Sequence, residues 1–383
     1  MKILHIITSL ELGGAERLLT ELVPYQKSKG HFVKVMILSD RGAVFKKELE
    51  DREIEIVVAK NNSIKSFSNI FSIVNEIKKE NYDIVHAHLV HAQYWTRLAK
   101  LLDGKKRKYI TTEHSTSNRR RDSKLMRGID KFIFSGFDKI VSISEATQKS
   151  LQEWLERDDN SFEIIYNGID IKEFQLSEPY DKNELGIKED DYLVMMVSRF
   201  HQSKNQLGVA EALMWLPVKY KLVFVGDGKL EEDVKKYCQN NNLMSRVKFL
   251  GMRKDIPRLL KTADIVVQYS FFEGFGITAI EAMASEKPVI ASNVPGLSQV
   301  VEGAGILVDA KDSKELAKGI LSLRNEELYK EVSKKCLERS KKYTIEWCAN
   351  NYLELYEREY MRRLFSVELQ ARILFFNSGL WWL

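Results

Sequence analysis

Compact apolar runs alternate with amphipathic stretches through the first 165 residues. The run Ile3–Thr8 is bounded by turn residues, as expected of a strand buried on both faces, and Leu18–Val23 then shows helical spacing. This alternation predicts an α/β domain with a mainly parallel sheet. The further predicted strands are Phe32–Leu38, Ile54–Val58, Asp83–Ala87, Tyr109–Thr112, Asp138–Ser142 and Phe162–Ile165, and the further helices are Ile70–Lys79, Tyr94–Leu102 and Glu145–Leu155.

A polar segment then interrupts the pattern. Residues 174–191 contain proline and glycine without an apolar period, which predicts a linker. A second alternating series begins at Tyr192–Val197, and 383 residues are too many for one ordinary core. We therefore expect two facing, doubly wound, Rossmann-like domains, 1–173 and 192–343, with the binding site in a deep cleft between them. The further strands expected are Tyr220–Val225, Val247–Leu250, Asp264–Gln268, Val289–Ala291 and Gly305–Val308.

Two carboxylates mark the stretch Tyr269–Ile290. Glu273 and Glu281 stand eight residues apart, and the glycines at 274 and 276 allow backbone to approach a ligand closely. The predicted helix Ile277–Ala284 would point its free N–H groups at this loop, which suits a phosphate or another anionic oxygen. The alternative is a surface loop with two solvated acids.

Two cations occupy comparable positions in the second series. Arg199 follows a predicted strand and Lys204 begins a predicted helix, in the same layer as Glu273. Cations so placed would stabilise negative charge on a leaving diphosphate. Ordinary surface cations are the alternative.

The first strand is followed by Gly13-Gly14 and a helix. This order is typical of the first turn in a doubly wound sheet, where ligands gather at strand C-terminal ends. The third glycine of a dinucleotide fingerprint is missing, so a tight turn without a ligand remains an alternative.

Histidines gather at two strand ends. His86, His88 and His91 lie close together, and positions 86 and 88 face the same side of a strand. A metal site is conceivable there, but no cysteine or acid cluster accompanies them, so we expect no metal. His114 also follows a strand, where it is either a ligand-binding residue or a satisfied structural histidine.

Composition indicates a soluble globular protein with reduced, cytosolic thiols. The chain is 44% hydrophobic and 30% charged, and its three cysteines are far apart. No apolar run reaches the length of a membrane span, and the N-terminus is expected to be a strand and not a signal peptide.

Positive charge is concentrated in residues 101–150, which hold twelve Lys or Arg against six Asp or Glu. Most of this charge comes from Lys105–Lys108 and Arg119–Arg121. These residues form either a binding patch for anionic lipid headgroups or a phosphorylated acceptor, or an ordinary solvated surface. Nucleic acid is not expected, because aromatic residues are not interleaved with the charges. The apolar end, Arg372–Leu383, is either a membrane or partner segment or a non-native extension.

From about residue 3 to residue 360 the chain resembles the retaining, GT-B-fold glycosyltransferases of family 4, which include bacterial capsule, exopolysaccharide and lipid-linked oligosaccharide enzymes. Five motifs in the family's order carry the resemblance. They are Gly13-Gly14-Ala15-Glu16, Asn167–Asp170, Ser198-Arg199-Phe200 through Lys204-Asn205, Val225–Gly228, and Glu273 with Glu281 followed by Pro288–Ser292.

The resemblance implies a role for each matching residue. Glu281 would hold the ribose of a nucleotide sugar, Arg199 and Lys204 would bind its diphosphate, and Glu273 would contact the sugar. The family's histidine near the reacting sugar matches His114. Further donor contacts would come from Gly13, Gly14, Gly226, Phe275, Gly276 and Ile277.

The resemblance also implies that no cofactor or divalent metal is needed, and that C-terminal helices, here 344–383, return to the first domain. Three positions depart from the family pattern. Glu286 replaces a usual glycine, Pro295-Gly296 replaces Gly-Gly, and Gln299 replaces an acid. These departures weaken any prediction of phosphate contacts from residues 295–299.

The sequence thus predicts a cytoplasmic enzyme, peripheral at the inner face of the membrane. It would transfer a hexose or N-acetylhexosamine from a UDP sugar to a lipid-linked saccharide, with retention. The alternatives are a nucleotide-sugar epimerase or hydrolase of the same fold, and a non-catalytic subunit of a polysaccharide assembly complex.

Overall fold

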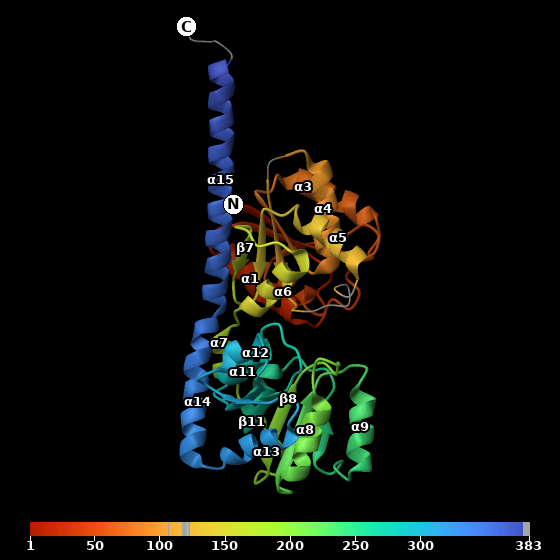
Figure 1. The fold of residues 1–383 in the computed structure, drawn as a ribbon, viewed down its shortest axis with the longest axis vertical. Coiled ribbons are helices and arrows are strands. Elements are labelled where there is room, and N and C mark those ends of the chain that lie inside the picture. Colours follow the sequence, from red (N-terminus) through yellow and green to blue (C-terminus); the bar gives the residue numbers. More distant parts are fainter. Residues whose placement is uncertain (106, 117–120, 122, 378–383) are drawn as a thin grey trace. The chain divides into compact units, whose positions relative to one another are not determined.

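The computed structural model describes residues 1–105, 107–116, 121 and 123–377, with backbone alone for residues 365–377. The chain forms two compact units, which Figure 1 shows as ribbons. Unit 1 comprises Met1–Tyr166 and the chain from Glu346 onward, and unit 2 comprises Asn167–Ile345.

Unit 1 is built on a seven-stranded parallel sheet in the order β3-β2-β1-β4-β5-β6-β7. Its strands are β1 (Lys2–Ile7), β2 (Phe32–Ile37), β3 (Glu55–Val58), β4 (Ile84–His88), β5 (Lys108–Glu113), β6 (Lys139–Ser142) and β7 (Phe162–Ile164). Its helices are α1 (Gly14–Ser28), α2 (Lys46–Asp51), α3 (Ser68–Glu80), α4 (Val90–Asp103), α5 (Lys124–Phe134), α6 (Glu145–Leu155) and α15 (Ile345–Asn377).

Helices cover both faces of this sheet. The series α3 to α6 packs each helix on the next, while α1 packs on α2. Right-handed crossovers place these two groups on opposite faces, because the chain leaves β1 in one direction and β4 in the other. The central strands are therefore buried on both sides, which explains their continuous apolar runs.

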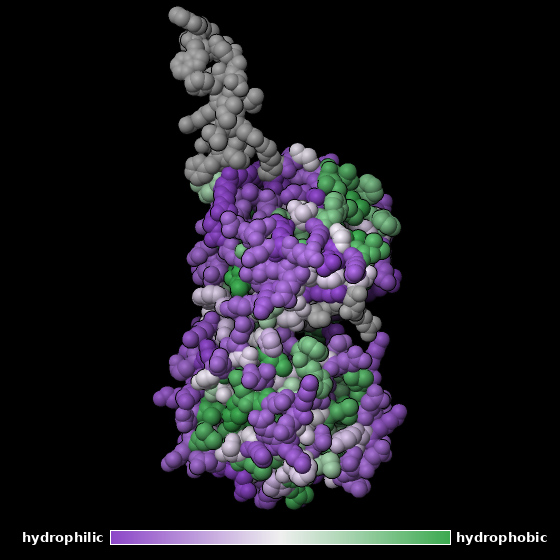
Figure 2. Space-filling view, viewed as in Figure 1, coloured by the Kyte–Doolittle hydropathy of each residue, from purple (hydrophilic) through white to green (hydrophobic). Residues whose placement is uncertain are grey.

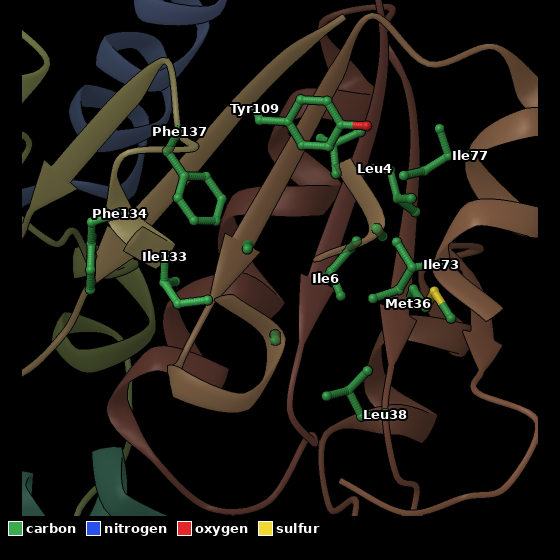
Figure 3. Packing of buried hydrophobic residues seen from close by; sticks show 14 of the residues in the cluster. Leu4, Ile6, Met36, Leu38, Ile73, Ile77, Tyr109, Ile133, Phe134 and Phe137 are labelled. Carbon is green, nitrogen blue, oxygen red and sulfur yellow. The ribbon is translucent and has the colours of Figure 1, made fainter. Parts of the chain in front are cut away.

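The core of unit 1 joins strands to the layer of α3 to α6. Figure 3 shows Leu4 and Ile6 of β1 close to Ile73 and Ile77 of α3, and all four side chains are fully buried. Ile133 and Phe134 of α5 extend the same cluster toward β5 and β6. Helix α5 was not predicted, so this part of the core was not foreseen.

Unit 2 repeats the architecture with a six-stranded parallel sheet in the order β10-β9-β8-β11-β12-β13. Its strands are β8 (Tyr192–Val197), β9 (Tyr220–Val225), β10 (Val247–Phe249), β11 (Ile265–Gln268), β12 (Val289–Ser292) and β13 (Ile306–Val308). Its helices are α7 (Ile171–Gln175), α8 (Gln206–Ala212), α9 (Glu231–Asn240), α10 (Ile256–Thr262), α11 (Ile277–Ala284), α12 (Leu297–Val301), α13 (Ser313–Ser322) and α14 (Glu326–Ser340), with the 3-10 helices η2 (Lys182–Leu185), η3 (Leu213–Trp215) and η4 (Lys341–Tyr343). The predicted doubly wound, Rossmann-like class is confirmed for both units.

The predicted linker 174–191 is not a free connection, because it belongs to unit 2. Lys182 Nζ bonds Asp264 at 2.8 Å, Tyr180 Oη donates to Asp255 at 2.6 Å, and Asp181 caps η2. Polar side chains hold this segment to unit 2, so it shows no apolar period. The first unit correspondingly ends at Tyr166 and not at residue 173.

The C-terminal part of the chain returns to unit 1 from Glu346 onward. Tyr352 and Tyr356 of α15 are fully buried, and Lys108 of β5 bonds Glu359 at 3.1 Å. In the apolar segment Arg372–Leu383, the side chains and residues 378–383 lie outside the described residues.

Helix α11 ends in a Schellman motif. The amide of Lys287 donates to Ala282 O and that of Glu286 to Met283 O, at 3.2 and 3.1 Å. Glu286 adopts the left-handed conformation, with φ 63°, at a position that glycine favours. The departure from the family's glycine therefore leaves a strained residue at this turn.

We expect Glu286→Gly to raise the free energy of unfolding by about 0.5–1 kcal/mol, because glycine adopts this conformation without the Cβ clash. Thermal and urea unfolding would measure the change. Glu286→Ala is the control, since it removes the carboxylate but keeps the Cβ. An equal gain from alanine would contradict the backbone explanation.

Candidate functional site

The strand order leaves a site open at the carboxyl ends of two central strands of unit 2. Strand β8 lies between β9 and β11, and the chain continues from β8 to β9 and from β11 to β12, in opposite directions along the sheet. Neither crossover covers the carboxyl ends of β8 and β11, and ligands of doubly wound sheets bind at such a point. Arg199 follows β8 and Tyr269–Gly276 follows β11, so the topology brings the two predicted motifs together.

Backbone hydrogen bonds join these motifs directly. Asn205 N donates to Tyr269 O and Phe271 N to Ser203 O, both at 2.8 Å. Lys204 lies between these two bonds, and its ammonium group forms an ion pair with Glu273. Both side chains are more than four-fifths buried, with 19% and 17% exposed. Lys204 and Glu273, which the sequence puts in the same layer, thus lie in direct contact.

The loop before α11 ends at a glycine in the left-handed region. Gly276 has φ 93° and is the N-cap of α11, so Ile277 begins the helix and Glu281 lies one turn further on. Phe275 is buried and meets the ring of Tyr343 edge to face, with centroids 5.4 Å apart. The loop is therefore anchored at Phe275 while the free N–H groups of the helix start remain at its end.

Gly296 supports this loop from outside, a role that the sequence did not reveal. It has φ 86°, and a Cβ there would lie 2.5 Å from Glu273 O and 2.8 Å from Gly274 O. Only glycine lets the backbone of residues 295–296 approach Glu273 so closely. The change of Gly-Gly to Pro295-Gly296 thus keeps the glycine that the packing requires.

Arg199 is exposed at the end of β8, and its loop is fixed by neighbours. Phe200 N donates to Asp227 O at 2.7 Å, and Gly226 N donates to Gly251 O at 2.8 Å. Gln206 of α8 donates to Arg199 O at 2.9 Å. Gly226 thus lies in the layer of loops that follow β8, β9 and β10.

In unit 1 the carboxyl ends of the central strands β1 and β4 are open in the same way. Gly13 is the N-cap of α1 and Gly14 its first residue, and Gly13 has extended backbone with φ −164°. His88 ends β4 and His114 follows β5, and their rings are hydrogen-bonded at 3.3 Å. His91 is the second residue of α4 and not part of a strand.

The histidines form one buried network with a member that the sequence did not indicate. His5 of β1 contacts His88 at 3.0 Å, and His86 bonds Tyr356 Oη at 2.5 Å and Thr112 Oγ1 at 2.8 Å. Burial lowers the pKa of His5 and of His114 to about 4, and lowers the pKa values of His86 and His88 well below the usual range. All four rings are therefore neutral at pH 7.

Of the described residues in the predicted basic patch, Lys105 is exposed, whereas Arg107 is buried and Lys108 and Arg121 are half-buried. Arg107 is buried and bonds Asp103 at 2.6 Å, because a cation inside unit 1 needs a partner. Lys108 bonds Glu359, and Arg121 bonds Ser150 at 2.6 Å. Lys105 contacts Asn81 at 3.1 Å. Lys106, Arg119 and Arg120 lie outside the described residues.

Two family models together match most of the chain. The model for Glycosyltransferase Family 4 matches residues 12–173, and that for glycosyl transferases group 1 matches residues 177–343. With the two Rossmann-like units and the Lys204–Glu273 site, these matches define the class as a glycosyltransferase of GT-B fold. The chain is a glycosyltransferase with a family 4 domain followed by a group 1 domain.

Curated relatives agree with this assignment. The chain is 28% identical over 290 residues to the UDP-Gal:alpha-D-GlcNAc-diphosphoundecaprenol alpha-1,3-galactosyltransferase of Escherichia coli, covering 71% of this chain and 74% of the relative. It is 28% identical to the N-acetyl-alpha-D-glucosaminyl L-malate synthase of Bacillus anthracis, covering 68% and 70%. The structure of Anabaena HepE in complex with UDP and glucose shares the fold, with TM-score 0.84, 24% identity and coverage of 94% and 100%.

We expect Gly296→Ala to lower the free energy of unfolding by about 2 kcal/mol or more, because the new methyl group meets Glu273 O in a strained backbone. Gly303→Ala is the matched control. Gly303 also has positive φ, at 74°, but a Cβ there would meet only Arg339 at 3.8 Å. Thermal unfolding would compare them, and equal losses would refute close packing at Gly296.

Proposed function

We propose that this glycosyltransferase moves a hexose or N-acetylhexosamine from a UDP sugar to a lipid-linked saccharide, with retention of configuration. The ion pair of Lys204 and Glu273 at the open edge of β8 and β11 carries the proposal. In this pair a cation that would bind a diphosphate lies beside a carboxylate that would bind sugar hydroxyls. The printed names of the relatives support the donor and acceptor, since one uses UDP-Gal and a diphosphoundecaprenol acceptor.

Each donor group would find a chemically matched partner in unit 2. Lys204 and Arg199 would bind the diphosphate, and the N-terminus of α11 at Ile277 would add N–H donors. Glu281, one turn into α11, would accept hydrogen bonds from the ribose hydroxyls. Glu273 would accept hydrogen bonds from sugar hydroxyls, and the backbone N–H groups of Phe275 and Gly276 would donate to sugar oxygens. Gly226 would add a donor contact in unit 2, and Gly13 and Gly14 of unit 1 stay predicted donor-binding residues.

The ion pair also explains how the site would stay ordered before the donor arrives. Lys204 and Glu273 are mostly buried, and either one left alone there would be costly. A diphosphate would give Lys204 a second anion, and sugar hydroxyls would share Glu273. The charged side chains would thus be in position before the donor binds, which lowers the free energy of reorganisation during the reaction.

Retention and metal independence follow from the same charges. The bond from the anomeric carbon to the diphosphate would break first, leaving negative charge beside Lys204 and Arg199. The acceptor hydroxyl would then bond to that carbon on the same face, and its proton would pass to the departing phosphate oxygen. Two cations and a helix N-terminus would supply the positive charge that a divalent metal provides elsewhere. His114 would lie near the reacting sugar.

We expect Lys204→Ala to lower kcat by about a hundredfold or more, because charge develops on the diphosphate only as the bond breaks. Turnover of a panel of UDP sugars in EDTA, with a lipid-linked saccharide acceptor, would measure it, and product NMR would read the anomeric configuration. Lys318→Ala, an exposed lysine of α13, is the control.

Each outcome of this assay bears on the proposal. Near-normal turnover in Lys204→Ala would refute the role of that cation. Equal consumption of the donor with and without acceptor would indicate a hydrolase or epimerase. UDP binding without any turnover would indicate a non-catalytic subunit.

A lipid-linked acceptor requires contact with a membrane surface, and α5 offers an apolar face for it. Leu125, Ile129 and Phe132 recur at helical spacing and are 76%, 37% and 47% exposed. Figure 2 shows hydrophobic residues gathered on unit 1 over the region where Figure 1 places α3, α4 and α5. Among the described residues, no helix is long and apolar enough to cross a bilayer. We infer peripheral binding through α5, with Lys124 beside the apolar face as a contact for anionic lipid.

We expect Leu125→Ser with Phe132→Ser to weaken binding to anionic vesicles about tenfold or more, because each side chain loses apolar burial. Vesicle flotation would measure it with phosphatidylglycerol-containing and neutral vesicles. Leu176→Ser is the matched control, since Leu176 is 77% exposed in unit 2. No flotation of the unaltered protein, or equal flotation of the double variant, would refute contact through α5.

A further inference from the structure

A continuous line of hydrogen bonds leads from α1 to His114. The carbonyl oxygen Oε1 of Gln26 faces His5 Nε2 at 2.8 Å. His5 Nδ1 faces His88 Nε2 at 3.0 Å, and His88 Nδ1 faces His114 Nε2 at 3.3 Å. Gln26, His5 and His88 are fully buried or nearly so, which excludes water as a competing partner.

The orientation of the Gln26 amide sets the direction of this line, with Oε1 facing His5 and Nε2 buried without a hydrogen-bond partner among the described residues. A neutral imidazole has one N–H donor and one acceptor nitrogen, and burial keeps these rings neutral. Gln26 Oε1 can only accept, so His5 donates from Nε2 and accepts at Nδ1. His88 must then donate from Nε2 to His5 and accept at Nδ1. His114 must donate from Nε2, which leaves the lone pair on its Nδ1.

His114 Nδ1 is the open end of the line. This atom is inaccessible to solvent, and it has no hydrogen-bond partner among the described residues. A buried nitrogen without a partner costs free energy, so its retention calls for an explanation. A ligand hydroxyl that donates to Nδ1 would satisfy it.

The same histidines could instead hold a metal ion. His5, His86 and His88 each offer one ring nitrogen, and these atoms lie within 4.8 Å of one another. An ion there would break the bond between His5 and His88. Both ring nitrogens of each of these residues already contact a side chain, so the hydrogen-bonded arrangement accounts for them without an ion.

We infer that Gln26, His5 and His88 act as positioning residues that hold His114 in the Nε2–H tautomer, so that its Nδ1 accepts a hydrogen bond from a saccharide hydroxyl. The assignment of this hydroxyl to a saccharide rests on the proposed function, whereas the assignment of the tautomer does not. The opposite tautomer would present an N–H donor, which would favour a phosphate or carboxylate oxygen. Gln26 thus decides which chemistry His114 offers.

NMR of the full chain with ¹⁵N-labelled histidine tests this directly, because long-range couplings distinguish Nε2–H from Nδ1–H rings. We expect Nε2–H for His5, His88 and His114 in the unaltered protein without substrate. An Nδ1–H form at any of the three would overturn the relay. Added Zn²⁺ that shifts the nitrogens of His5, His86 and His88 together would overturn it in favour of a metal site.

Gln26→Leu removes the fixed acceptor at similar volume. His114 should then populate both tautomers, and kcat should fall about fivefold, the equivalent of one neutral hydrogen bond, with the KM for the UDP sugar little changed. Thr112→Val is the matched control, since it removes a bond to His86 outside the line, and it should leave the His114 tautomer unchanged. An unchanged tautomer in Gln26→Leu would refute the role of Gln26.

These readouts separate the relay from the proposed function. The tautomers are read without substrate, so failure of transfer with every UDP sugar would overturn the function and leave the relay standing. The unaltered protein alone decides the relay if Gln26→Leu does not fold.

Discussion

The divergence of crossovers at the centre of each parallel sheet is the constraint on which the rest of the structure depends. Adjacent strands β8 and β11 send the chain in opposite directions, and right-handed connections then run over opposite faces. The carboxyl ends between them stay uncovered, so loops that follow those strands can meet a ligand. Unit 1 repeats this arrangement at β1 and β4. The residues with chemistry lie at these two edges because no helix can cover them.

The edge in unit 2 is held in shape by backbone as much as by charge. Residues 203–205 pair with 269–271, which fixes Lys204 relative to Glu273 before any donor binds. Gly296 packs against Glu273 O from the other side, and Phe275 is anchored on Tyr343. A loop fixed at several points loses little conformational freedom on binding, so its charges can be directed at the diphosphate without reorganisation.

The edge in unit 1 depends on buried polar groups instead. Polar rings inside a sheet are tolerated only when their hydrogen bonds are satisfied, and satisfied networks define one arrangement of the core. His5, His86 and His88 meet this condition through Gln26, Thr112, Tyr356 and one another. Burial keeps them neutral, so each ring has one donor and one acceptor nitrogen. Among the described residues, the one ring nitrogen of this histidine network without a hydrogen-bond partner is Nδ1 of His114.

Periodicity alone determined the two α/β units, and five motifs placed Arg199, Lys204, Glu273 and Glu281 after strands or at a helix. These features are local, because the periods of strands and helices appear in the spacing of apolar residues within a short segment. The tertiary structure decided what depends on distant neighbours. It paired His5 with His88, joined Gln26 to them, buried Arg107 in the predicted basic patch, attached the predicted linker to unit 2 and brought Gly296 onto Glu273. Apart from the bond of Arg107 to Asp103, these contacts join residues 21 to 83 positions apart. They arise from strand order and packing, which no local pattern encodes.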